Sequence, residues 1–190
     1  MALSAAAPSL EPSALTSFIA SSVPHPVSDD PRQAQLHALA LQVLHNLQYQ
    51  HDWHSLTIHT ESTSSSSATA PPRPLLSGIP PRRMYTHPDM QIELIKKGMG
   101  EEDVEPERVY VIPSMLKEKW SLRTFADCFS AMPTPYEARQ KQQDEQGSDE
   151  GAGRKWPGDD VKRALLATVD DDSTVVYYVV HDGIVKPRQN

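Results

Sequence analysis

The segment that most constrains the fold lies near the end of the chain, where residues 173–180 read STVVYYVV. β-Branched and aromatic residues dominate it, as they do in β-strands. Side chains alternate between the two faces of a strand, and a half-buried strand therefore alternates apolar with polar residues. Here Val175, Tyr177 and Val179 share one face, and Thr174, Val176, Tyr178 and Val180 share the other. Both faces are apolar, so this strand needs cover from two sides, and a small domain readily supplies only one.

A second apolar run, RALLATV at residues 163–169, precedes this strand. Three aspartates, Asp170, Asp171 and Asp172, separate the two runs. Aspartate is a good turn former because its carboxylate accepts hydrogen bonds from nearby backbone N–H groups. The pattern predicts a C-terminal β-hairpin with an acidic turn.

The pattern upstream predicts helices mixed with short strands. Asp30 followed by Pro31 is a helix start, and apolar residues recur at helical spacing over 31–49. Residues 53–60 are broadly in strand register, and RVYVIP at 108–113 predicts a short strand that Pro113 stops. We expect a small α/β domain, a mixed sheet with flanking helices.

The segment after that strand, residues 114–132, has a one-sided apolar pattern and predicts helix, with Ser121 as a possible second start. Three other stretches are too polar or too low in complexity for a core. They predict a disordered tail over residues 1–29 and linkers over 61–74 and 133–160. Residues 30–190 are then one domain that two linkers interrupt.

The composition limits what the chain can bind. The net charge is −7, which speaks against a protein that holds nucleic acid by its own basic surface. The single cysteine, Cys128, excludes an internal disulfide and lies in an apolar helical pattern, so we expect it to be buried. His51 and His54 have workable zinc spacing, but no cysteine lies nearby, and we predict neither a metal nor a cofactor. No apolar run approaches the ~20 residues of a membrane span.

Three motifs resemble a known family. They are YTHPD at residues 85–89, YVIPSMLKEKWSLRTFADCF at 110–129 and LLATVDDDSTVVYYVVHDGIVKPRQN at 165–190. Together they resemble the small structural subunit, often called subunit fifteen, of the eukaryotic tRNA-splicing endonuclease, in its fungal form. The resemblance implies a tRNA-endonuclease-like α/β domain. It also implies a heterotetramer of two nuclease and two structural subunits that excises introns from precursor tRNA and leaves 2′,3′-cyclic phosphate and 5′-hydroxyl ends.

The resemblance also implies that this chain is not itself a nuclease. Nuclease subunits of the family use a Tyr-His-Lys trio for acid–base catalysis and charge stabilisation. Arg108 occupies the position of the histidine, and arginine does not release its proton near neutral pH. No tyrosine lies between Tyr85 and Tyr110, where the family pattern places one, and Lys162 is the one remaining candidate. We predict a structural subunit without catalytic residues.

The family's last strand pairs tail to tail with the equivalent strand of a neighbouring subunit, which implies a partner interface here. Its predicted residues are Thr174, Val175, Val176, Tyr177, Tyr178, Val179 and Val180. The alternative is that both faces of this strand pack inside the domain. The aspartates of the turn, Asp170 to Asp172, have two readings: an acidic turn that docks on another subunit, or a plain polar turn.

Candidate RNA contacts are Arg82, Arg83 and Lys162, although precursor tRNA is expected to reach this chain mainly through the other subunits. Two other functions stay open. One is a divergent nuclease that uses Tyr85, His87 and Lys162. The other is a stand-alone adaptor or homodimer outside tRNA splicing. The expected compartment is the nucleus, or the mitochondrial outer surface through the complex.

Overall fold

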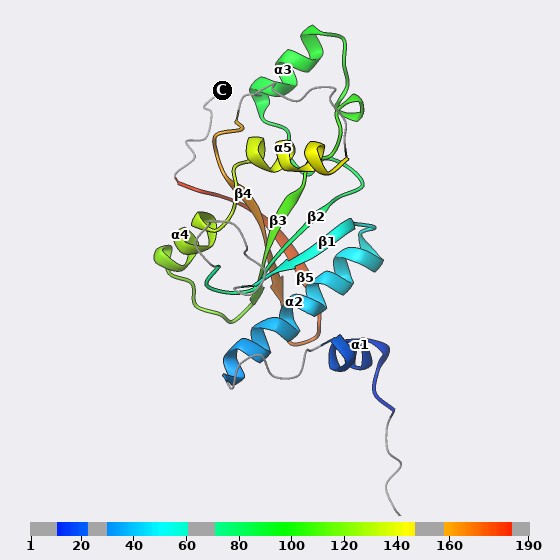
Figure 1. Ribbon diagram of the computed structural model, residues 1–190, viewed down its shortest axis with the longest axis vertical. Coiled ribbons are helices and arrows are strands. Elements are labelled where there is room, and N and C mark those ends of the chain that lie inside the picture. Colours follow the sequence, from blue (N-terminus) through cyan, green and yellow to red (C-terminus); the bar gives the residue numbers. More distant parts are fainter. Residues whose placement is uncertain (1–10, 23–29, 61–70, 147–157, 184–190) are drawn as a thin grey trace, which may run out of the picture.

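The computed structural model describes residues 11–22, 30–60, 71–146 and 158–183. Its centre is a five-stranded sheet with the strand order β1-β2-β3-β4-β5 (Figure 1). The strands are β1 (His54–His59), β2 (Leu75–Ile79), β3 (Val109–Met115), β4 (Arg163–Val169) and β5 (Val175–His181). β3 and β4 are parallel and the other neighbours are antiparallel. The predicted mixed α/β fold and its C-terminal hairpin are confirmed.

α2 and α4 lie against opposite faces of this sheet (Figure 1). The helices are α1 (Ala14–Ser22), α2 (Pro31–Gln50), α3 (Pro88–Lys96), α4 (Leu122–Ser130) and α5 (Pro135–Gln146), with a short 3-10 turn at Glu101–Asp103. α2 starts where the sequence predicted, because the Asp30 carboxylate accepts a hydrogen bond from the N–H of Arg32 at 3.0 Å.

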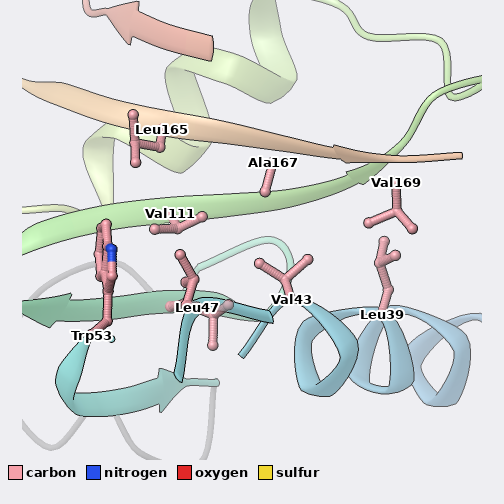
Figure 2. Packing of buried hydrophobic residues seen from close by; sticks show 9 residues of the cluster. Leu39, Val43, Leu47, Trp53, Val111, Leu165, Ala167 and Val169 are labelled. Atoms are coloured by element: carbon pink, nitrogen blue, oxygen red, sulfur yellow. The ribbon is translucent and has the colours of Figure 1, made fainter. Parts of the chain in front are cut away.

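α2 covers one face of the sheet. Leu39, Val43 and Leu47 follow one another at four-residue spacing and point at β3 and β4 (Figure 2). They pack on Val111 and Ala167, which are completely buried. Burying one such side chain contributes about 1.5–3 kcal/mol, so this layer supplies much of the stability of the fold.

α4 covers part of the opposite face. Its residues Cys128 and Phe129 pack with Ile112 of β3 and Ala164 of β4. The predicted burial of Cys128 is confirmed, and burial raises the pKa of its thiol to about 11. A thiol in that state is neutral near pH 7 and packs as a small apolar group.

Two predicted boundaries were wrong. β3 continues through Pro113 to Met115, because β2 pairs with β3 no further than Val111. Pro113 therefore lies where β3 has one neighbouring strand, and a missing N–H is tolerated there. α4 begins at Leu122 with Ser121 as its N-cap, and the residues between Met115 and Ser121 form no helix.

Two segments predicted to lack structure contain helices. α1 lies inside the predicted tail, 1–29, and α5 lies inside the predicted linker, 133–160. α5 is polar in sequence, yet its Ala138 is 4% exposed. Its Arg139 is paired with the carboxylate of Asp159, which is itself buried. Contacts made by single residues hold this helix in place, and the low-complexity composition of the segment did not indicate them. Residues 147–157 of the predicted linker lie outside the described residues.

The end of the predicted linker 61–74 is also part of the domain. Residues 61–70 lie outside the described residues, but Arg73 is 6% exposed. Its guanidinium binds the carboxylate of Glu118 through two parallel hydrogen bonds of 2.9 and 3.1 Å and lies 4.7 Å above the Trp120 ring. The Trp120 N–H donates to Ser114 at 2.8 Å. This network anchors the chain just before β2.

Candidate functional site

β5 is an outer strand of the sheet. All seven of its residues pair with β4, from Val175 opposite Val169 to His181 opposite Arg163, without a bulge. It is the last strand in the order, so its second edge has no strand partner within the described ranges. A regular, exposed edge is a template for pairing with another chain.

The hydrogen bonds at the ends of this ladder show which backbone groups face outward. The N–H of Asp182 donates to the carbonyl of Lys162 at 2.9 Å, and the N–H of Asp170 donates to the carbonyl of Thr174 at 2.9 Å. In an antiparallel pair, consecutive residues alternate between facing the partner and facing away. The positions whose N–H and C=O point away from β4 are therefore Val175, Tyr177, Val179 and His181.

One face of β5 belongs to the core of the domain. Val175 and Tyr177 pack against the cluster under α2. The Tyr177 hydroxyl donates to the amide oxygen of Asn46 at 2.6 Å, and its ring meets His51 edge to face at 5.4 Å. Burial raises the pKa of Tyr177. Among the predicted interface residues, Tyr177 therefore offers its backbone at the edge, while its side chain fixes β5 to α2.

Other side chains of β5 are open to solvent. Val176 and Tyr178 are 44% and 53% exposed on the face that α4 only partly covers, and Val179 is 44% exposed. Val180 packs against the cluster under α4. The alternative that both faces of β5 pack inside the domain therefore fails for Val176, Tyr178 and Val179. Val176 and Tyr178 lie on one face of this edge strand, and Val179 lies on the other.

Each of the three carboxylates of the acidic turn makes a contact within the domain. Asp170 accepts from the N–H of Asp171 at 2.8 Å, and Asp172 accepts from the N–H of Thr174 at 2.8 Å. The bond from Thr174 holds the pKa of Asp172 below its usual value. The third carboxylate, that of Asp171, contacts the ammonium group of Lys117 at the surface. The turn thus has a structural role, and its docking on another subunit stays a prediction.

The three candidate RNA contacts have different surroundings. Arg82 is exposed. Arg83 has a side chain that is 5% exposed and binds Glu107 at 3.1 Å, and burial lowers the pKa of its guanidinium. The ammonium group of Lys162 donates to the carbonyl of Phe129, near the end of α4, at 2.8 Å. Arg83 and Lys162 are thus engaged within the domain.

A buried charge cluster was missed in the sequence. Glu107 is 8% exposed and is held by Arg83 at 3.1 Å, Arg163 at 2.9 Å and Arg139 at 3.6 Å. Arg139 also binds Asp159 at 3.0 Å. The cluster ties α5 and the loop before α3 to the start of β4. Its members come from four distant segments, so no local motif announces it.

Tyr85, His87 and Lys162 do not assemble into a catalytic trio. The Tyr85 ring lies 4.8 Å from the guanidinium carbon of Arg163. His87 is the N-cap of α3: its Nδ1 accepts from the backbone at 3.2 Å. Its ring packs on Gly158 (φ +87°), where an added Cβ would come within 2.7 Å of the His87 ring. Each of these side chains, like Lys162, has a packing or capping partner instead of a shared acid–base centre.

Arg108, which stands in place of the family's histidine, has a structural role as well. It donates to the carbonyl of Ser55 at 2.9 Å and to the hydroxyl of Ser77 at 3.3 Å. Within the described ranges, no group of His, Cys, Asp and Glu side chains is arranged to hold a metal ion. None of the helices described there is long and apolar enough to cross a membrane.

A small mixed sheet with an exposed, regular, apolar edge strand is typical of proteins that pair with another chain. The comparisons agree with this class. The family model described as Sen15 protein matches residues 42–190. A Neurospora crassa protein named "Probable tRNA-splicing endonuclease subunit tsp-1" is 43% identical over 162 residues, which cover 82% of this chain and 67% of that protein. The chain belongs to the Sen15 family, and the resemblance seen in the sequence is confirmed.

Proposed function

We propose that this chain is a non-catalytic structural subunit and that β5 is the strand through which it pairs with a nuclease subunit. Membership of the Sen15 family makes the chain a subunit of the tRNA-splicing endonuclease. Its own contribution is then to hold a nuclease subunit in position for intron excision. Precursor tRNA meets the complex mainly through the other subunits, as the net charge of −7 favours.

The observation that carries this proposal is the open edge of β5. Four residues turn outward backbone groups that have no strand partner within the described ranges, and a strand added there gains hydrogen bonds worth about 0.5–1.5 kcal/mol each. Val176, Tyr178 and Val179 are about half exposed. Covering them adds a further contribution of about 3 kcal/mol, on the usual figure of 1.5–3 kcal/mol for each fully exposed side chain. Backbone and side chains thus favour the same partner geometry.

The absence of catalysis rests on the surroundings of Arg108 and Lys162. Arg108 is bound to Ser55 and Ser77, and a guanidinium does not serve as a general acid. Lys162 is bound to a main-chain carbonyl. Both side chains are thus engaged in contacts that hold the fold together.

The test is coexpression with the nuclease subunits, followed by pull-down and a precursor-tRNA cleavage assay. The variant is Val176→Asp with Tyr178→Asp, which places charge on the exposed face and spares the core. Its matched control is Thr57→Asp, an exposed position on β1 at the other edge of the sheet. We expect the double variant to lose partner and cleavage together, and the control to keep both. Retained pairing in a folded double variant would refute the proposal.

A backbone substitution tests the edge itself. Val179→Pro removes an N–H that faces outward, so it should weaken pairing while the hairpin persists. Tyr178→Pro removes an N–H that faces β4 and should destabilise the domain instead. If both prolines have equal effects on folding and pairing, the outer edge is not the interface.

The rival function, an adaptor or homodimer outside tRNA splicing, has a distinct signature. The chain would then purify with no nuclease subunit when all subunits are coexpressed. Light scattering of the chain alone would show a dimer that the charged β5 variant abolishes. The nuclear location stays a prediction from the sequence, and imaging of a tagged chain tests it.

A further inference from the structure

One face of β5 carries the side chains of all four residues whose backbone groups point away from β4. They are Val175, Tyr177, Val179 and His181, because the outward backbone and the side-chain direction both recur every two residues. Val175 and Tyr177 pack against the cluster under α2. Val179, the next residue on this face, is 44% exposed. α2 therefore supports the N-terminal half of the open edge.

The ring of Tyr85 supports the other half. It meets the imidazole of His181 edge to face, with ring centroids 5.5 Å apart and an interplanar angle of 73°. The guanidinium carbon of Arg163 lies over the same ring, 4.8 Å from its centroid. Arg163 is the β4 residue directly opposite His181 in the ladder. A single aromatic ring thus contacts both residues of the pair that ends β5.

The buried charge cluster fixes Arg163 from the other side. The Arg163 guanidinium donates to the carboxylate of Glu107 at 2.9 Å and to the carbonyl of Gly158 at 3.1 Å. Glu107 is 8% exposed, so this ion pair is shielded from water. Two hydrogen bonds from one planar group hold it in one orientation. The cluster therefore extends through Arg163 and Tyr85 to the end of β5.

The loop that carries Tyr85 is anchored on both sides of this residue. Two residues before it, Arg83 binds Glu107 at 3.1 Å. Two residues after it, the His87 ring packs on Gly158 and caps α3. Tyr85 itself belongs to neither of the two hydrophobic clusters of the sheet. The loop thus presents one ring to the end of β5 from outside both clusters.

The surroundings of His181 are those of a covered side chain at a strand end. Burial lowers the pKa of its imidazole, and the guanidinium of Arg163 lowers it further. The next residue, Asp182, donates its N–H to the carbonyl of Lys162 at 2.9 Å, and Gly183 follows with a φ of 85°. The contact with Tyr85 therefore lies where the ladder ends and where strands fray most readily.

We propose that Tyr85 is a positioning residue for subunit pairing: its ring holds His181, and with it the C-terminal half of the open edge, in the extended form that an added strand requires. This role of Tyr85 rests on the proposed pairing through β5. Ordering the backbone of one free residue on binding lowers a binding constant roughly tenfold. Tyr85 removes that cost, because it orders the end of the edge before the partner arrives.

The experiment is a competition assay on the complex. Labelled wild-type chain, bound to the nuclease subunit that coexpression recovers, is titrated with unlabelled variants. We expect Tyr85→Ala to compete about tenfold more weakly than the wild type. Tyr85→Phe keeps the ring that makes both contacts and should compete as the wild type does. The matched control, Tyr49→Ala, removes a ring contact with His45 on α2 (centroids 4.6 Å apart) and should also compete as the wild type does.

Two measurements on the free chain separate positioning from a general loss of structure. In Tyr85→Ala, the pKa of His181 measured by NMR should rise toward its usual value, because the imidazole loses part of its cover. Hydrogen exchange should increase at the amide of Asp182, which ends the ladder, and stay unchanged at the amide of Val176. A general loss of stability would instead increase exchange along the whole of β5.

The outcomes distinguish this role of Tyr85 from the pairing itself. If Tyr85→Ala competes as well as the wild type while Val176→Asp with Tyr178→Asp does not compete, β5 pairs without help from Tyr85, and only the positioning role is refuted. If the charged double variant competes as well as the wild type, the pairing through β5 is refuted and the positioning role with it.

A second variant tests the same contact from the strand. His181→Ala leaves Tyr85 and its loop intact, so it remains informative if Tyr85→Ala does not fold. It should compete about tenfold more weakly than the wild type, and combining it with Tyr85→Ala should weaken competition no further. Competition by His181→Ala equal to that of the wild type would refute the positioning role, as would a uniform rise of hydrogen exchange along β5 in Tyr85→Ala.

Discussion

The two outer strands of the sheet differ in the properties that govern strand pairing. β1 is polar on its exposed face, its ladder with β2 shifts between His54 and Thr57, and Ser55 has a φ of 51°. The Arg108 side chain also donates a hydrogen bond to the carbonyl of Ser55 at 2.9 Å. β5 pairs with β4 over its full length without a shift, and its exposed side chains are valine and tyrosine.

This difference shows how one sheet distinguishes its two edges. Bulges and polar or charged residues at an edge prevent unwanted pairing, and β1 has both. β5 has neither, although it is the more apolar strand and the greater risk for aggregation. An unprotected edge of this kind is stable in a cell when a partner covers it, which supports the assignment of β5 as the pairing strand.

The largest expected effect separates the two faces of β5. Tyr177→Asp puts a carboxylate into the core under α2 and should lower the free energy of unfolding by about 4 kcal/mol. Tyr178→Asp, one residue on and 53% exposed, should cost less than about 1 kcal/mol. Urea denaturation of both variants measures this. Similar losses would mean that β5 is covered on both faces, and the comparison with β1 would then fail.

The next effect concerns the protection of β1. Arg108→Ala removes the side-chain donor to the carbonyl of Ser55 and one of two hydrogen-bond partners of the Ser77 hydroxyl, the other being His59 Nε2 at 2.8 Å. It should lower the free energy of unfolding by about 1–2 kcal/mol. Hydrogen exchange should rise in residues 54–59 and stay unchanged in β5. Lys117→Ala, at an exposed side chain, is the control and should leave hydrogen exchange unchanged in both strands. Unchanged exchange in β1 would show that its irregular backbone protects the edge without help from Arg108.

Regular elements with a clear period could be predicted from the sequence. The α2 stripe, the hairpin and the burial of Cys128 were all visible as local patterns. α5 was not, because a polar helix is held by Ala138 and by an ion pair between Arg139 and Asp159, residues twenty positions apart. Local composition does not contain that information.

The site was predictable to a similar degree. Alternation in STVVYYVV indicated an apolar strand in need of cover, but it did not indicate which face α2 would take. Tyr177 and Tyr178 look equivalent in the sequence, and the hydrogen bond from Tyr177 to Asn46, distant along the chain, separates them. Arg83 looked available to RNA until the fold paired it with Glu107. Long-range pairing decides such cases, and a single sequence does not reveal it.

A smaller effect tests how β5 is fixed to α2. Tyr177→Phe removes the hydroxyl that donates to Asn46 and keeps the ring, so the free energy of unfolding should fall by about 1 kcal/mol. Asn46→Ala should cost a similar amount, and the double variant should cost less than the sum of the two. Thermal or urea unfolding of the four proteins completes this cycle. Strict additivity would mean that the two groups do not interact in solution.

The smallest effect lies in the turn that leads into β5. Because the Thr174 N–H bond holds the pKa of Asp172 below its usual value of about 3.9, the charged carboxylate stabilises the folded chain above that pH. This contribution is lost as the pH falls through the lowered pKa, so it should disappear below about pH 4. Asp172→Asn keeps an acceptor for Thr174 but does not titrate. Its urea midpoint should lie below that of the wild type near pH 7 and fall less between pH 5 and 3, so that the two converge in acid. Asp171→Asn should retain the acid dependence that Asp172 confers. An identical acid limb in wild type and Asp172→Asn would show that the turn does not depend on the charge of Asp172. In that case only the side chains and the outward-facing backbone of β5, and not the charge in its turn, would distinguish this edge from β1.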